Sequence, residues 1–186
     1  MEAIFCQTPR LNIRKIQESD FSDFCSFLID PETCYLMGRE IITNEAEARQ
    51  TFQWLKDEEE RGYALIFRDN QRAIGNLTVS TPHHLSVRNE VAGKSGVTLS
   101  FSLDRGYRRK GLMQEALEAV IAKLFHEEHW DYINCGNFDF NHPSAQLQKK
   151  LGFVHLYTEE INVDGEHFSC VENILWNPES NNPLHT

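Results

Sequence analysis

Apolar and polar residues follow one another along this chain with two different spacings. Strand-like patterns of short, alternating or apolar runs occupy residues 11–16, 64–68, 73–80, 96–103, 132–138, 153–163 and 165–176. Helical spacing occupies residues 19–30, 43–60, 112–129 and 141–151, and Gly62 is expected to end the second helix. The Asp164-Gly165 dipeptide predicts a hairpin turn between the last two strands. The order of these elements predicts one α+β domain that covers residues 1–186.

The charge of the chain restricts the partners that it can attract. The 18 Lys and Arg residues against 28 Asp and Glu residues leave a formal net charge of -10. Such a field repels phosphate backbones, so nucleic-acid binding is not expected. It attracts cationic partners such as protonated amines, although solubility alone explains the same charge.

Cysteine usage and hydropathy indicate a cytoplasmic protein. The five cysteines are scattered and contain no C-x-x-C pair, which is typical of reduced thiols. The first ten residues, MEAIFCQTPR, lack a basic segment followed by an apolar run, so a secretory signal is not expected. No run approaches the roughly 18 apolar residues of a membrane span, so no membrane association is expected. The sequence leaves open a monomer or a homodimer.

The segment SFSLDRGYRRKGLMQEA, residues 100–116, carries the most informative chemistry. A predicted strand runs into a basic, glycine-containing turn that opens the clearest helix of the chain. The first N–H groups of a helix lack partners and lie at the positive end of its dipole, so a diphosphate fits there. Gly111 allows close approach of the backbone, whereas the Walker A pattern GxxxxGK[ST] is absent. A strand–helix turn with a solvated basic cluster remains the alternative.

This turn resembles the phosphate loop of the GNAT superfamily of acyl-CoA-dependent N-acyltransferases, which reads Q/R-x-x-G-x-G/A. Arg108 and Gly111 match that pattern, while Met113 stands where a small residue is usual. Thr8-Pro9-Arg10-Leu11 is similar to the opening strand of the ribosomal-protein N-acetyltransferase-like branch. Asn141-His142-Pro143-Ser144 with Leu151-Gly152-Phe153 resembles the N-x-x-S…L-G-F segment of that branch.

The resemblance implies a GNAT fold, with a mixed, mostly antiparallel sheet flanked by helices and splayed between the fourth and fifth strands. It implies acetyl-CoA or coenzyme A as co-substrate and a primary amine as acceptor. Asn141 and Ser144 would be catalytic, Asn141 by binding the pantetheine and Ser144 by protonating the departing thiolate, although helix capping is the alternative for both. Cofactor contacts would come from Phe101, Ser102, Leu103, Arg108, Arg109, Lys110, Gly111, Leu112, Met113, Gln114, Asn141 and Ser144.

Two positions depart from the family pattern around the proton transfers. Many GNAT enzymes place a tyrosine acid where this chain has Gln148, and members of the branch often carry a glutamate where it has Thr98. The general base therefore stays open among Glu90, His83 and His84 in the loop of residues 81–95, or a water relay polarised by Thr98 or Ser100. Tyr157 is the other group that could meet the thiolate.

The reaction predicted by the resemblance needs no metal ion, because an activated thioester is attacked directly by the amine. His126-Glu127-Glu128-His129 does not match H-E-x-x-H and is expected to lie on the surface. The favoured acceptor is the α-amine of a peptide or protein. The alternatives are a small amine, such as a polyamine, amino sugar or amino acid, and a non-catalytic module that binds acyl-CoA.

Overall fold

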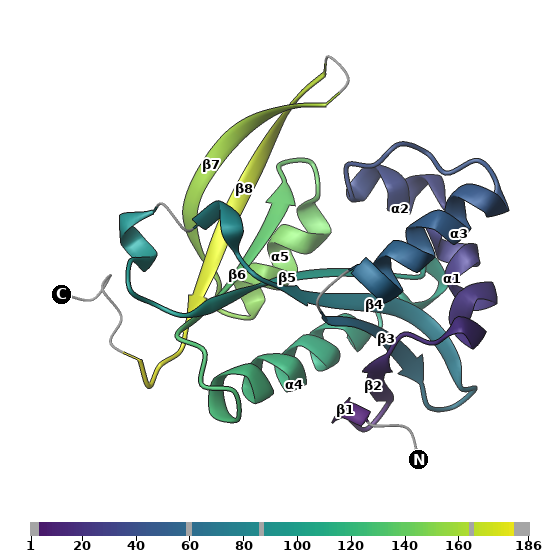
Figure 1. Cartoon of the computed structure of the whole chain (residues 1–186), viewed down its shortest axis with the longest axis horizontal. Coiled ribbons are helices and arrows are strands. Elements are labelled where there is room, and N and C mark those ends of the chain that lie inside the picture. The colour runs from purple at the N-terminus through teal and green to yellow at the C-terminus, as the bar shows by residue number, and fades with distance from the viewer. Residues whose placement is uncertain (1–3, 59–60, 86–87, 164–165, 181–186) are drawn as a thin grey trace. The chain divides into compact units, whose positions relative to one another are not determined.

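The computed structural model describes residues 4–58, 61–85, 88–163 and 166–180 (Figure 1). The chain forms two compact units, one of residues 1–79 with 100–120 and the other of residues 80–99 with 121–186. Strand β5, Gly96–Leu103, and helix α4, Leu112–His126, each run through both units. The prediction of one domain over residues 1–186 stays a prediction.

The first unit contains an antiparallel sheet with helices. Its strands are β1 (Ile4–Gln7), β2 (Leu11–Lys15), β3 (Arg61–Phe67) and β4 (Arg72–Ser80, whose last residue belongs to the second unit), and they pair in chain order. Its helices are α1 (Phe21–Leu28), α2 (Pro31–Leu36) and α3 (Glu45–Gln53), with a π-helical turn at Trp54–Glu58 and 3-10 turns at Glu18–Asp20 and Arg105–Tyr107. Asn44 caps α3 by accepting a hydrogen bond from the N–H of Glu47.

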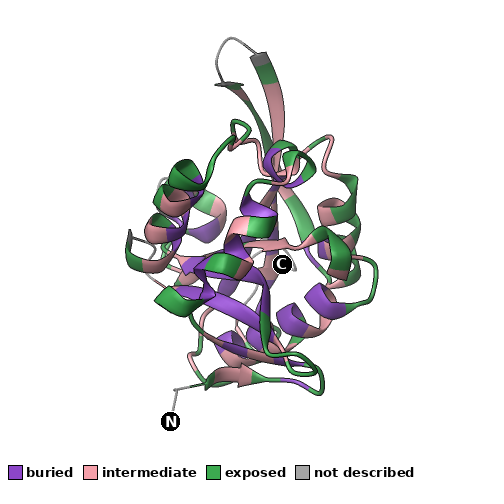
Figure 2. Ribbon diagram, turned by 90° about the vertical axis from the view of Figure 1, so that its right-hand side faces the viewer, coloured by how far each residue is buried: buried purple, intermediate pink, exposed green. Residues whose placement is uncertain are grey.

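An aromatic core holds the helices of this unit together. Phe24 and Phe52 are fully buried and meet edge to face with ring centroids 5.2 Å apart. Phe21 also meets Phe52 edge to face, with ring centroids 5.3 Å apart. The helix predicted over residues 19–30 therefore packs through its phenylalanines. Figure 2 shows the buried segments of the chain in purple.

The expectation that Gly62 ends a helix is wrong, because Gly62 lies in β3. The helical pattern stops at the π-helical turn, and the carbonyl oxygen of Leu55 then approaches the glycine closely. A Cβ atom at residue 62 would lie 2.1 Å from that oxygen. The glycine serves this close approach of backbones and not a helix end.

The second unit is built on a mixed sheet. β5 pairs with β6 (Tyr132–Phe138) in parallel, β6 pairs with β8 (Glu166–Trp176) antiparallel, and β8 pairs with β7 (Val154–Val163) antiparallel. Helix α5 (His142–Lys150) follows β6, and 3-10 turns occupy His83–Leu85 and Asn89–Val91. The predicted turn residues Asp164 and Gly165 lie outside the described residues.

The predicted fourth and fifth strands are β5 and β6, and their register is short. It joins Gly96, Val97 and Thr98 to Tyr132, Ile133 and Asn134, whereas β6 continues alongside β8 as far as Phe138. The α+β class and the mixed sheet of eight strands, antiparallel in all the described pairings but this one, agree with the sequence prediction.

Hydropathy and cysteines add two observations about the described residues. None of the helices among them is long and apolar enough to cross a membrane. No disulfide joins the five cysteines, all of which lie in the described ranges.

Candidate functional site

The segment between β5 and α4 turns sharply through two residues in the left-handed backbone region. Arg109 has a φ of 60° and Gly111 a φ of 74°. α4 starts directly after Gly111, and none of the described residues accepts a hydrogen bond from the backbone N–H groups of residues 111–114. These are the unpaired donors that the sequence predicts at the start of this helix.

The loop has the properties of an anion site. Arg109, Lys110 and Gly111 are exposed, so the positive charges and the N–H groups are accessible together. Met113, which departs from the family pattern, is only 7% exposed, so its side chain is packed inside while its N–H stays at the helix start. The residues present therefore fit a diphosphate at this loop.

A clamp of hydrogen bonds from the turn between β1 and β2 fixes the start of α4. The Glu115 carboxylate, in the first turn of the helix, accepts hydrogen bonds from the hydroxyl of Thr8 at 2.6 Å and from the N–H and Nε of Arg10 at 2.9 and 2.6 Å. Arg10 also donates from Nη1 to the carbonyl of Lys110 at 2.9 Å. The Thr8-Pro9-Arg10-Leu11 motif thus holds the loop and the helix that follows it.

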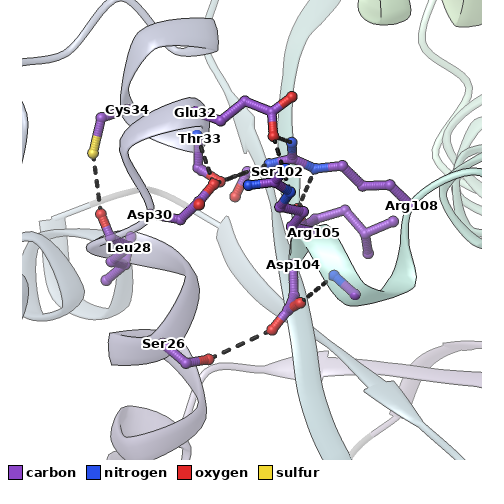
Figure 3. Close-up of polar contacts among 12 residues, drawn as sticks. Ser26, Leu28, Asp30, Glu32, Thr33, Cys34, Ser102, Asp104, Arg105 and Arg108 are labelled. Carbon is purple, nitrogen blue, oxygen red and sulfur yellow. Dashed lines mark hydrogen bonds and ion pairs between the residues drawn. The ribbon is translucent and has the colours of Figure 1, made fainter.

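Arg108 makes its side-chain contacts with the start of α2 and the end of β5, as Figure 3 shows. Its Nη2 donates to the hydroxyl of Thr33 at 2.6 Å, and its Nε donates to the carbonyl of Leu103 at 3.0 Å. Its guanidinium also lies 3.3 Å from a carboxylate oxygen of Glu32 and 3.7 Å from one of Asp30. A phosphate contact by Arg108 stays a prediction that requires some of these bonds to be exchanged.

The strand residues predicted to contact pantetheine are partly exposed. Phe101, Ser102 and Leu103 are the last three residues of β5, and all three are intermediate in exposure. The Ser102 hydroxyl donates to the side-chain oxygen of the buried Asn76 on β4 at 2.5 Å, so this side chain is already engaged. Contact with pantetheine at these positions would therefore come from backbone groups.

Asn141, Ser144 and Gln148 form a connected set at the start of α5. Oδ1 of Asn141 accepts the N–H of Ser144 at 3.2 Å and caps the helix. Nε2 of Gln148 donates to the hydroxyl oxygen of Ser144 at 3.0 Å, and its Oε1 accepts from Nδ2 of Asn173 at 2.8 Å. Because Gln148 supplies a donor to the Ser144 oxygen, the hydroxyl proton of Ser144 remains available for donation.

The candidate general bases in the second unit have different partners. Nε2 of His84 lies 3.0 Å from Oδ1 of Asn134, and Thr98 donates to that same oxygen at 3.0 Å. Glu90 pairs instead with Arg88, with 3.9 Å between the charged atoms. The side chain of His83 lies outside the described residues.

A buried carboxylate that was not predicted from the sequence also contacts Asn134 and His84. Glu172 on β8 is 8% exposed, accepts from Nδ2 of Asn134 at 2.7 Å, and lies 3.7 Å from Nε2 of His84. The sequence does contain a signal for it. Glu172 lies two and four residues before the buried Ile174 and Trp176, so the alternation of β8 places a carboxylate on the buried face.

The predicted site residues are distributed over both units. The strand end and the loop of residues 101–114 lie in the first unit, while Asn141, Ser144 and Gln148 lie in the second with His84 and Glu172. In the second unit, Asn173 links the two groups, because its Nδ2 donates to Gln148 and its carbonyl accepts from Asn134. Across the described ranges, no group of three or more His, Cys, Asp or Glu side chains is arranged to hold a metal ion.

Comparison with protein families decides where this chain belongs. The family model of the acetyltransferase (GNAT) domain matches residues 10–154, which is most of the chain. The chain is a member of the GNAT acetyltransferase domain family. A comparison with curated protein sequences gives no match to this GNAT protein.

Solved structures agree with the GNAT fold at low sequence identity. A GNAT-family acetyltransferase from Bacillus anthracis has a TM-score of 0.80 at 17% identity, covering 95% of this chain and 100% of its own. Ribosomal-protein-S5-alanine acetyltransferase from Vibrio fischeri has a TM-score of 0.68 at 17% identity, covering 96% and 98%. Spermidine N-acetyltransferase from Vibrio cholerae, solved with CoA and spermine, has a TM-score of 0.71 at 13% identity, covering 91% and 97%.

Proposed function

We propose that this GNAT protein transfers an acetyl group from acetyl-CoA to a primary amine, and that the favoured acceptor is the α-amine of a peptide or protein. One observation carries the proposal. The unpaired N–H groups of residues 111–114, the left-handed Gly111 and the exposed Arg109 and Lys110 together form a site for a diphosphate.

The residues around the start of α5 support the second half of the reaction. When acetyl-CoA binds, its thioester supplies an activated acetyl group, so no nucleophile from the protein is needed. Ser144 is then the proton donor for the departing thiolate, with its oxygen held by Gln148. Asn141, as the cap of α5, positions Ser144 through the 3.2 Å bond to its N–H.

The ionisation of the acceptor favours an α-amine. An amine must be neutral to attack, and a lysine-type amine with a pKa near 10.4 costs about 4.6 kcal/mol to deprotonate at pH 7. An α-amine with a pKa near 7.8 costs only about 1 kcal/mol. A GNAT protein with Thr98 in place of a strand glutamate is better suited to the second kind.

A small cationic amine is the second candidate, and the charge of the chain favours it. A net charge of -10 attracts polyamines as readily as peptides, and one similar fold is that of a spermidine N-acetyltransferase. A module that binds acyl-CoA without turnover is the third candidate, because Thr98, Met113 and Gln148 all depart from the family pattern.

The experiment is a turnover assay with acetyl-CoA and a panel of acceptors, read by thiol release and by mass spectrometry of the product. The panel pairs each peptide with its N-terminally blocked form, and adds spermidine, an amino sugar and free amino acids. Acetylation of the open peptide alone supports the proposal. Turnover of small amines only would support the second candidate function instead. CoA binding without any turnover would support the third.

The phosphate loop is tested by Gly111→Val. Valine is disfavoured at the φ of 74°, so the loop should leave the shape that presents its N–H groups. We expect CoA affinity to fall by at least about 1.4 kcal/mol, which is about tenfold, in isothermal titration calorimetry. Gly93→Val is the matched control, because Gly93 also has a positive φ of 72° but lies outside the loop. Unchanged affinity in a folded Gly111→Val protein would place the diphosphate elsewhere.

A further inference from the structure

The side-chain amide of Asn134 fixes the orientation of a polar group on the sheet of the second unit. Its nitrogen donates to the Glu172 carboxylate at 2.7 Å and to the carbonyl of Asn173 at 3.1 Å. Both partners can only accept, so the atom that faces them must be Nδ2. Oδ1 therefore faces the hydroxyl of Thr98 and the ring of His84, each at 3.0 Å.

This orientation determines which nitrogen of His84 titrates. An amide oxygen can only accept, so Nε2 of His84 must carry a proton to bind Asn134. The second proton of the imidazolium is consequently gained and lost at Nδ1. The His84 side chain is 39% exposed, whereas that of Glu172 is 10% exposed, so the ring is the part of the group that a ligand can reach.

The space for the Glu172 carboxylate is made by a glycine on the neighbouring strand. Gly136 is directly opposite Glu172 in the β6–β8 register, and a Cβ atom at residue 136 would lie 2.4 Å from Oε1 of Glu172. Cys170 also donates to that oxygen, at 3.5 Å. Although burial favours the neutral form, contacts with His84 and Asn134 hold the pKa of Glu172 below its ordinary value.

The charges that act on His84 come from the last two strands. Glu172 on β8 and Glu159 on β7 are the two negative charges that act on the ring, and Cys170 on β8 contacts Glu172. Arg88 lies over the ring of Tyr157, 3.2 Å from its centroid, and pairs with a carboxylate. The Glu172 carboxylate, opposed by partial burial, raises the pKa of His84 above 6.5.

We infer that His84 is the general base that accepts the proton of the acceptor amine at Nδ1, with Glu172 and Asn134 as its positioning residues. The inference rests on the proposed function. It gives a role to a carboxylate from β8 in a chain that has Thr98 where the family resemblance predicts a glutamate. Thr98 belongs to the same group as the second donor to Oδ1 of Asn134.

In the proposed step, the amine nitrogen forms a bond to the acetyl carbon, the carbon–sulfur bond breaks, and the electron pair leaves on sulfur. The proton lost from nitrogen goes to Nδ1 of His84 and then to solvent, while the thiolate takes its proton from Ser144, which solvent restores. His84 must be neutral to act, so its raised pKa should give kcat/KM an acidic limb of its own, in addition to the limb from deprotonation of the acceptor amine.

The test is the pH–rate profile of His84→Gln with a saturating CoA donor. Glutamine keeps an N–H donor for Asn134 but cannot take up a proton. We expect kcat/KM for the amine to fall about 100-fold at pH 8 and the acidic limb assigned to His84 to disappear. His126→Gln is the matched control, because His126 lies on α4 with its side chain 60% exposed and should retain both rate and profile.

A second measurement needs no activity. The ring protons of His84, assigned by their loss in His84→Gln, should titrate above pH 6.5 in NMR spectra of the wild-type protein. In Glu172→Gln the neighbouring charge is removed, so the midpoint should move to lower pH, and the acidic limb of kcat/KM should move with it. If Glu172→Gln does not fold, the pH–rate profile of His84→Gln still tests the inference.

The possible results separate this inference from the proposed function. Wild-type turnover with a full rate and an unchanged limb in His84→Gln would overturn the inference alone. A wild-type protein that acetylates no amine would overturn both. A His84→Gln protein that loses rate but keeps the limb would make His84 a structural residue and would also overturn the inference.

Discussion

The most informative single residues are those that replace a familiar catalytic group. Gln148 stands where many GNAT enzymes have a tyrosine acid, and it is 1% exposed and bonded to the hydroxyl of Ser144. An amide cannot protonate a thiolate at neutral pH, but it can hold a hydroxyl that does. The sequence predicts this transfer of the role to Ser144, and the 3.0 Å bond gives it a physical basis.

This role is tested by Ser144→Ala. A thiol is a good leaving group, so the help of a proton donor should be at the low end of general-acid effects, and we expect kcat to fall about 10- to 100-fold. CoA affinity should stay nearly unchanged in calorimetry. Ser22→Ala, at an exposed position of α1, is the control. Full kcat in Ser144→Ala would reduce Ser144 to a helix residue and direct attention to Tyr157.

Asn141→Ala should behave differently from Ser144→Ala. Asn141 caps α5 and is proposed to bind the pantetheine in the ground state and in the transition state alike. We therefore expect the apparent KM for acetyl-CoA to rise at least as clearly as kcat falls. Steady-state kinetics with saturating acceptor measures both. A fall in kcat alone would assign Asn141 to the transition state only.

At the scale of elements, the clearest contact is the clamp between the β1–β2 turn and the first turn of α4. Thr8 and Arg10 together give Glu115 three hydrogen bonds. Although burial favours the neutral form, the bonds from Thr8 and Arg10 hold the pKa of Glu115 below its ordinary value. The Thr8-Pro9-Arg10-Leu11 motif thus holds the start of α4 and the loop before it.

Glu115→Ala should therefore destabilise the protein by about 2–3 kcal/mol, since bonds to a charged group are lost together. Because the pKa is depressed, the wild-type advantage should be complete above the ordinary value of 4.5 and should shrink as the pH falls below it. Urea denaturation at pH 7 and pH 4 measures both effects. Glu118→Ala, one turn on and exposed, should change stability by less than about 0.5 kcal/mol.

Sequence patterns predict best the helices and strands whose structure is determined by their own residues. β5 and β6 have the predicted bounds, and α4 ends three residues early. β1 and α2 escape prediction because four and six residues carry little periodicity, and α2 is held by Arg108 from a distant segment. The roles of Gly62 and Glu172 could not be predicted for the same reason. The Leu55 carbonyl close to Gly62 and the Gly136 that faces Glu172 are brought there by tertiary structure.

At the scale of the whole molecule, the net charge of -10 should govern encounter with the acceptor. Salt screens such attraction, with a Debye length of about 30 Å at 0.01 M and about 8 Å at 0.15 M. We expect KM for a peptide of charge +2 to rise at least about threefold between these salt concentrations, while kcat stays constant. A peptide of zero net charge with the same first residues is the control. Equal responses of both peptides would contradict electrostatic attraction.

The facing pair of Gly136 and Glu172 has an evolutionary consequence. With 2.4 Å between a hypothetical Cβ at residue 136 and Oε1 of Glu172, a side chain there would displace the carboxylate from its contacts with Asn134 and His84. Selection for those contacts would therefore retain glycine at residue 136. Related sequences that carry the glutamate should accordingly carry glycine at residue 136 more often than those that lack it.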